Sequence, residues 1–171
     1  MDSPMILKAL QIYINPVNLM KLLKIVILNS IIRFIGKLEI IISIKQKNFG
    51  IWEETTYSQY WEQAQWVGCA LDYYGIDRQD SVAIHSENRP EWFIADVAIQ
   101  AIGAVSVGLY PTNPPSEVAY LIGHSESKIL FAEDQEQVDK ALEVIDELPE
   151  LKKIIYFEPR GLTNYESPLL M

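Results

Sequence analysis

Four short apolar segments recur about every 24 residues in the second half of the chain, and this repeat constrains the fold more than any other feature. The segments are Ser81–His85, Val105–Tyr110, Lys128–Ala132 and Lys153–Phe157. Stretches with apolar residues at helical spacing separate them. Parallel strands need such crossovers, and near-continuous apolar strands indicate a sheet that is covered on both faces. The sequence therefore predicts an α/β fold, with βα repeats forming a mainly parallel sheet of about four strands and helices on both faces.

Capping signals place the starts of two helices. Thr56 and Gln59 have the spacing of a capping box, in which the hydroxyl accepts a free helix N–H and the amide reaches back. Asp134 and Gln137 repeat the pattern before a helix that we expect to extend to Leu148. Helices thus alternate with the apolar strands, although the order of the strands in the sheet cannot be read from the sequence.

Residues 1–47 differ from the rest and are assigned to a basic, Ile-rich leader, with residues 48–171 as the α/β region, which the family resemblance described below implies to be an incomplete N-terminal part of a larger domain. Thirteen large apolar residues in 25–44 favour membrane insertion by roughly 4–8 kcal/mol, whereas Arg33, Lys37 and Glu39 oppose it by roughly 7–10 kcal/mol. A transmembrane span is therefore not expected. Three interpretations stay open: an amphipathic helix on a membrane surface, a first helix docked on another part of a larger protein, and a non-native extension.

Charge and cysteine content exclude several classes of function. The leader has a charge of +5 and residues 48–171 have −14, giving the total of −9. An acidic main body argues against nucleic-acid binding, which needs clustered positive charge. The single cysteine, Cys69, excludes an intramolecular disulfide framework and fits a reducing, cytoplasmic compartment. With only two His and one Cys in the chain, no zinc or other metal site is expected.

Ligands of open parallel sheets bind at the carboxyl ends of the strands. These ends are expected at residues 86–88, at Tyr110-Pro111-Thr112 and at Glu133-Asp134. The polar residues there fit either a ligand-binding rim or helix caps and turns. For residues 86–92, SENRPEW, helix initiation is favoured, because caps alone account for such residues. His85 and His124 have no Ser, Cys or carboxylate partner at motif spacing, so neither is expected to be catalytic.

The segment GAVSVG, residues 103–108, has glycines five apart, as a phosphate-binding P-loop does. Leu109 and Tyr110 follow where a P-loop requires Lys and Ser or Thr. Gly103 also follows a predicted helix, whereas the first glycine of a P-loop follows a strand. We therefore interpret Gly103 as a helix stop.

Four motifs distinguish the main body: NRPEW, GAVSVGLYPTNP, AYLIGHSESK and EDQEQVDK. Their order along residues 49–171, nearly three quarters of the chain, resembles the N-terminal region of bacterial long-chain fatty acid–CoA ligases, members of the AMP-forming acyl-adenylate superfamily. The resemblance implies a two-step reaction. A fatty carboxylate attacks the α-phosphate of ATP with Mg²⁺, and coenzyme A then displaces AMP to form the thioester.

The sequence departs from this family in what it lacks. The family's phosphate-holding signature of the SGTTGxPKG type is absent, as are the later nucleotide- and Mg²⁺-binding motifs and the catalytic Lys of the C-terminal domain. We therefore expect a truncated ligase that is inactive alone, with no catalytic, cofactor-binding or metal-binding residue in this polypeptide. Tyr110, Pro111 and Thr112 are predicted to border an acyl or nucleotide site in an intact homologue.

Two alternatives to an inactive fragment stay open. One is a split ligase, whose partner is the separately encoded remainder. The other is a non-catalytic module that binds a partner or contacts a membrane surface through residues 1–47. In either case the chain is expected to be cytoplasmic or peripheral to a membrane.

Overall fold

The computed structural model describes residues 41–171, so most of the predicted leader lies outside the described residues. The chain divides into two compact units. One contains the described residues up to Gly75 together with Phe93–Ile102. The other contains Ile76–Trp92 and Gly103–Met171 and holds the predicted sheet.

The second unit contains a four-stranded sheet in the order β4-β3-β5-β6. Its strands are β3 (Ser81–His85), β4 (Val105–Leu109), β5 (Ile129–Ala132) and β6 (Lys153–Tyr156). Every pair of neighbouring strands is parallel, which confirms the predicted α/β fold. Each strand begins and ends within one residue of the bounds predicted for its segment. Residues 169–171 extend the sheet beyond β6 through a parallel bridge between Ile154 and Leu170.

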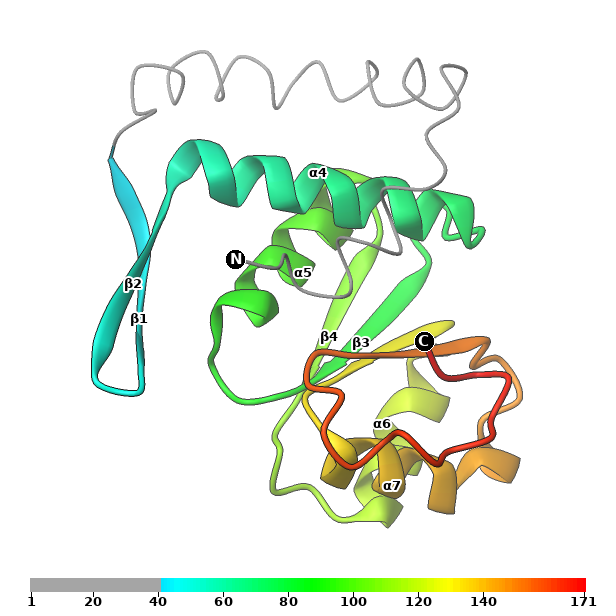
Figure 1. Ribbon diagram of the computed structural model, residues 1–171. Helices are drawn as coiled ribbons and strands as arrows, with labels where there is room; N and C mark the ends of the chain where they lie inside the picture. Colours follow the sequence, from blue (N-terminus) through cyan, green and yellow to red (C-terminus); the bar gives the residue numbers. More distant parts are fainter. Residues whose placement is uncertain (1–40) are drawn as a thin grey trace. The chain divides into compact units, whose positions relative to one another are not determined.

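Helices α6 (Pro115–His124) and α7 (Gln135–Glu143) belong to the same unit and lie together in Figure 1. They contribute to a core cluster of buried apolar residues against one face of the sheet. Its members include Ala83, Leu109, Val118, Ile122, Leu130, Ala132, Val138, Ala141 and Ile154. The alternate strand residues Val82, Ile84, Ile129 and Phe131 are buried as well. Burial of successive residues explains why the strands have continuous apolar sequences.

The predicted extension of α7 to Leu148 is wrong. The helix ends at Glu143, Val144 leaves helical geometry (φ −111°, ψ 16°), and a 3₁₀ turn, η2, covers Ile145–Glu147. The β-branched residues Val144 and Ile145 have restricted side-chain rotamers, which makes them weak formers of a regular last turn. Because the apolar residues continue into the turn, the helical pattern extended beyond the helix itself.

The first unit contains a β-hairpin and α4 (Tyr57–Tyr73). The hairpin joins β1 (Ile42–Asn48) to β2 (Ile51–Thr56) in antiparallel pairing through Phe49 and Gly50. It projects beyond the start of α4 in Figure 1. Thr56 and Gln59 form the predicted capping box at the start of α4. Neither strand of the hairpin was predicted, and most of β1 falls in the segment assigned to the leader. The boundary at residue 47 stays a prediction.

Helix α5 (Pro90–Ala101) begins at Pro90, within the segment 86–92 that was predicted to start a helix. Proline at a first helical position costs no hydrogen bond, because an N–H at that position would have no partner within the helix. Across residues 41–171, none of the helices has the length and apolar character needed to cross a membrane.

Candidate functional site at the carboxyl edge of the sheet

The parallel register brings the three predicted polar segments to one edge of the sheet. His85, the last residue of β3, is paired with Leu109 of β4 on one side and with Ala132 of β5 on the other. The segments that follow these residues therefore leave the sheet at the same level. They begin at Ser86, Tyr110 and Glu133.

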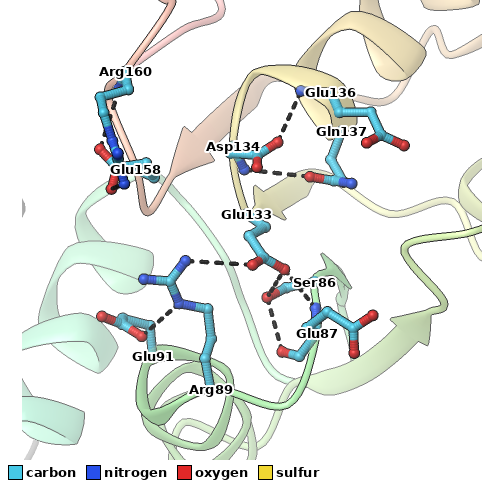
Figure 2. A network of polar contacts seen from close by, with 10 residues as sticks. All are labelled: Ser86, Glu87, Arg89, Glu91, Glu133, Asp134, Glu136, Gln137, Glu158 and Arg160. Carbon is cyan, nitrogen blue, oxygen red and sulfur yellow. Dashed lines mark hydrogen bonds and ion pairs between the residues drawn. The ribbon is translucent and has the colours of Figure 1, made fainter. Parts of the chain in front are cut away.

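Glu133 is the centre of a polar network at this edge (Figure 2). Its carboxylate accepts a hydrogen bond from the Ser86 hydroxyl at 3.1 Å and one from the Glu87 backbone N–H at 2.6 Å. It also lies 3.5 Å from the Arg89 guanidinium. A residue after β5 thus fixes the whole turn after β3, and both belong to the same unit.

Arg89 is held by neighbouring acidic groups and by an aromatic ring. Its Nε donates to Glu91 at 2.8 Å, and its guanidinium carbon lies 5.8 Å from the centre of the Phe157 ring. Burial disfavours the charged guanidinium, but the hydrogen bond that Arg89 donates to Glu91 and the charges of Glu91 and Glu133 raise the pKa of Arg89 above its ordinary value. Arg89 therefore stays a cation that is committed to partners within the protein.

The segment SENRPEW thus contributes side chains that bind one another and Glu133, just before α5 begins. This arrangement supports the interpretation of the segment as a turn and helix start. Its chemistry is structural: it joins the ends of two strands. Asp134 plays the corresponding part for α7, since it accepts from the Glu136 backbone N–H and forms the predicted capping box with Gln137.

The charges in the network make this part of the edge acidic. Six of the residues drawn in Figure 2 are acidic and two are basic. The acidic residues are Glu87, Glu91, Glu133, Asp134, Glu136 and Glu158, and the basic ones are Arg89 and Arg160. A polyphosphate needs cations and oriented backbone N–H groups, so the network by itself does not suit ATP. Over residues 41–171, no grouping of His, Cys, Asp and Glu suits a metal ion.

The second feature of the edge is the Tyr110–Thr112 loop, which connects β4 with α6. Tyr110 is 79% exposed. Its carbonyl lies 3.1 Å from Nε2 of His85 and also accepts from the Asn113 backbone N–H at 2.9 Å. The Pro111 carbonyl accepts from Nζ of Lys140, on α7, at 2.6 Å. The structure therefore places all three predicted site residues in a loop whose backbone is held from β3 and from α7.

His85 is fully buried. A carbonyl oxygen can only accept, so the contact with Tyr110 requires the proton on Nε2 and leaves Nδ1 as the unprotonated nitrogen. Burial, followed by the nearby charge of Lys140, lowers the pKa of His85 to about 4, although the hydrogen bond to Tyr110 and the charge of Glu136 oppose this shift. The imidazole is consequently neutral at neutral pH and acts as a hydrogen-bond donor.

The glycines of GAVSVG do not form a phosphate loop. Gly103 has a φ of 82° and follows α5, while Gly108 lies within β4 beside the Trp92 ring. The interpretation of Gly103 as a helix stop therefore agrees with the structure. A phosphate-binding turn would instead need the glycines between a strand and a helix N-terminus.

Sequence reasoning missed the residues that hold the edge together. Glu133 was noted only as a strand end, and Lys140 was not singled out. Glu133 contacts Ser86 across 47 positions of sequence, and Lys140 contacts Pro111 across 29. One signal was available: a charged residue directly after a fully apolar strand, as Glu133 is after Ile129–Ala132, requires a partner or solvent.

Comparison with known proteins places these features in a family. The model of the AMP-binding enzyme family matches residues 39–168. The chain is 35% identical over 117 residues to the long-chain-fatty-acid–CoA ligase ACSBG2 of Xenopus laevis, covering 68% of this chain and 16% of that protein. It is 31% identical over 112 residues to the long-chain-fatty-acid–CoA ligase FadD15 of Mycobacterium bovis, covering 66% of this chain and 19% of that protein.

Solved structures give the same result for the fold. A crystal structure of the anthranilate CoA ligase AuaEII with anthranoyl-AMP superposes with a TM-score of 0.59 at 26% identity, covering 61% of this chain and 20% of that one. A putative long-chain-fatty-acid CoA ligase from Rhodopseudomonas palustris gives a TM-score of 0.60 at 22% identity, over 71% of this chain and 29% of that one, and supports the fold alone. The chain spans less than a fifth of the length of the curated relatives described above. The family match covers most of its sequence, and the chain belongs to the AMP-binding enzyme family.

Proposed function

We propose that this chain is the N-terminal part of a long-chain fatty acid–CoA ligase, which converts ATP, a fatty acid and coenzyme A to acyl-CoA, AMP and diphosphate. The observation that carries the proposal is the match of residues 39–168 to the AMP-binding family, together with relatives that are long-chain-fatty-acid–CoA ligases. The relatives include an animal ligase, ACSBG2 of Xenopus laevis at 35% identity, and a bacterial one, FadD15 of Mycobacterium bovis at 31%, so the bacterial type stays a prediction.

Under this proposal, the described edge of the sheet supports the fold of the intact enzyme and does not itself bind ATP or Mg²⁺. The described edge offers an acidic network and a fixed loop, and the GAVSVG glycines lie in a helix stop and a strand. The groups that bind ATP and Mg²⁺ would then lie in other parts of the intact enzyme. Accordingly, the 171-residue polypeptide alone should not turn over.

A chimeric ligase tests the proposal. Residues 41–171 replace the matching segment of FadD15, and AMP release is measured with palmitate, ATP, Mg²⁺ and coenzyme A. We expect palmitate-dependent AMP release from the chimera and none from the 171-residue polypeptide. A folded chimera without activity would contradict the assignment to this class of ligase, whereas turnover by the polypeptide alone would contradict the supporting role.

A second candidate function, contact with a membrane surface, is favoured by the hairpin. Phe49, Ile51 and Trp52 are 97%, 70% and 60% exposed around its turn, and the Lys47 ammonium lies 5.9 Å from the centre of the Trp52 ring. Exposed aromatic residues beside lysine suit the boundary between lipid headgroups and acyl chains. Such contact would place a cytoplasmic ligase beside its lipid substrate.

Liposome flotation tests the membrane contact. The full chain is compared with a F49S/W52S variant and with a Y73S variant, which removes an exposed aromatic residue from the far end of α4. We expect the full chain and Y73S to float with the vesicles and F49S/W52S to stay behind. Equal flotation of all three proteins would exclude the hairpin as the contact.

A further inference from the structure

Two polar side chains from different elements converge on the backbone of the Tyr110–Thr112 loop. His85, at the end of β3, donates from Nε2 to the Tyr110 carbonyl at 3.1 Å. Lys140, on α7, donates from Nζ to the next carbonyl, that of Pro111, at 2.6 Å. The Lys140 side chain is only 16% exposed and is itself held by Glu136 at 2.7 Å. Two successive carbonyls are thus fixed by donors that the sheet and a helix supply.

Packing alone does not explain the imidazole at this position. Among the described residues, the buried side-chain polar atoms without a hydrogen-bond partner are His85 Nδ1 and Asn113 Oδ1, and both are at this loop. A buried polar atom without a partner costs about 1–3 kcal/mol. An apolar residue at the end of β3 would avoid this cost. The gain that offsets it is the Nε2–H bond to the loop.

The two bonds fix the loop backbone and leave the Tyr110 ring in solvent. Tyr110 is 79% exposed as a residue, although its backbone carbonyl accepts from two donors, His85 Nε2 and the Asn113 N–H. Ordering a loop before its ligand arrives removes that ordering cost from binding. Lys140, the cation that contacts the loop, does not suit a phosphate, because its ammonium already contacts the Pro111 carbonyl and the Glu136 carboxylate. An exposed aromatic ring on a fixed backbone suits an apolar group instead.

We infer that His85 and Lys140 are positioning residues that hold the Tyr110–Thr112 loop in the shape in which its Tyr110 ring contacts the acyl chain of a fatty acid. The acyl ligand rests on the proposed function. The fixed loop rests on the contacts described above, so the two parts can be tested separately.

Backbone hydrogen exchange, measured by NMR on the 171-residue chain, tests the fixed loop. The reporter is the Asn113 amide, which donates to the Tyr110 carbonyl. Removing either donor in His85→Leu or Lys140→Met should accelerate exchange at Asn113 by about tenfold or more through local opening, while exchange at Ala83 in β3 stays unchanged. His85→Gln keeps a side-chain donor and should restore slow exchange.

Lys153→Met is the matched control, because Lys153 also donates to a backbone carbonyl, that of Pro168, in a different loop. It should leave the Asn113 amide unaffected. Unchanged exchange in Lys140→Met, equal acceleration at Asn113 and Ala83, or failure of His85→Gln to restore protection would overturn the positioning role. The nitrogen chemical shifts of the wild-type ring give a check that needs no variant: an Nδ1–H tautomer would also overturn it.

Photocrosslinking tests the ligand. A palmitate analogue with a diazirine near the end of its chain is irradiated with the wild-type chain and the variants, and labelled peptides are identified by mass spectrometry. We expect labelling at residues 110–112 in the wild type and His85→Gln, and at least a severalfold loss in Lys140→Met. If the Asn113 amide is protected but residues 110–112 are not labelled, the acyl ligand is refuted while the fixed loop stands. Absence of AMP release from the FadD15 chimera would instead contradict the proposed ligase reaction.

Discussion

His85 shows how one buried base links loop geometry to pH. In the unfolded chain the imidazole has an ordinary pKa of about 6.5, whereas in the folded protein burial and the charge of Lys140 lower this pKa to about 4. Between these values the unfolded state binds more protons than the folded state. The contribution of His85 to stability is therefore complete above pH 6.5 and is lost as the pH falls toward 4.

We predict that acidification from pH 6.5 to about 4 lowers the free energy of unfolding by roughly 3 kcal/mol through His85. Urea denaturation at several pH values measures this loss. The His85→Gln variant, which does not titrate, should lose correspondingly less stability over the same range. Parallel pH profiles for the wild type and His85→Gln would contradict the assignment.

Gly161 is a second residue whose identity the structure explains. Its φ is +85°, and an added Cβ would lie 2.0 Å from Oε1 of Gln135. Gln135 also donates to the Tyr165 hydroxyl at 2.9 Å. Alanine at this position therefore has an unfavourable backbone conformation and displaces a side chain that has a partner.

Gly161→Ala should lower the free energy of unfolding by about 2 kcal/mol, combining backbone strain with the loss of one hydrogen bond. Gly75→Ala is the matched control, because Gly75 has a similar φ of +77° but nothing within 4 Å of the added Cβ. We expect it to lower stability by only about 1 kcal/mol. Chemical denaturation compares the two, and equal losses would show that contact with Gln135 is unimportant.

Glu133 joins the ends of β3 and β5. Removing its carboxylate in Glu133→Ala leaves the Glu87 N–H and the Arg89 guanidinium without this acceptor. Hydrogen bonds to charged groups contribute about 1.5–3 kcal/mol, so we expect a loss of about 2–3 kcal/mol in thermal or chemical denaturation. Glu87→Ala removes an exposed carboxylate from the same turn and should change stability little. Comparable losses in both variants would indicate a general charge effect.

Local signals in the sequence predicted many of these elements. The capping boxes at Thr56 and Asp134 marked the first turns of α4 and α7, because a cap depends on residues three positions apart. The β1–β2 hairpin was missed, since its turn is Phe49-Gly50 and the usual hairpin signal at those positive φ angles is Asn-Gly or Asp-Gly. The loop donors His85 and Lys140 could not be paired with residues 110 and 111, because that pairing depends on strand order.

Strand order is a property of the complete sheet and not of any single strand. The chain places β5 between β3 and β6, so consecutive strands β4 and β5 are not neighbours. Periodicity gives each strand but no information on its partners, because all four strands have the same apolar character. The order nevertheless decides the site, since it puts the loop after β4 next to the end of β3.

The outer edge of β6 supports the last prediction. Residues 169–171 pair with it through three backbone bonds: Ile154 N–H to the Leu169 carbonyl, Met171 N–H to the Ile154 carbonyl and Tyr156 N–H to the Met171 carbonyl. An uncovered strand edge exposes donors and acceptors that pair with other chains. Deleting residues 169–171 should therefore lower stability by about 2–3 kcal/mol, from the three lost bonds at about 1 kcal/mol each, and promote self-association.

Light scattering at increasing protein concentration, together with urea denaturation, measures both effects. Met171→Ala is the control, because it removes the side chain and keeps the backbone bonds of the edge. A deletion variant that stays monomeric and as stable as Met171→Ala would show that these bonds do not protect the sheet. Self-association of the deletion variant alone would show that the edge of β6 must be covered, whether by residues 169–171 or by another strand, for the sheet to remain a single unit.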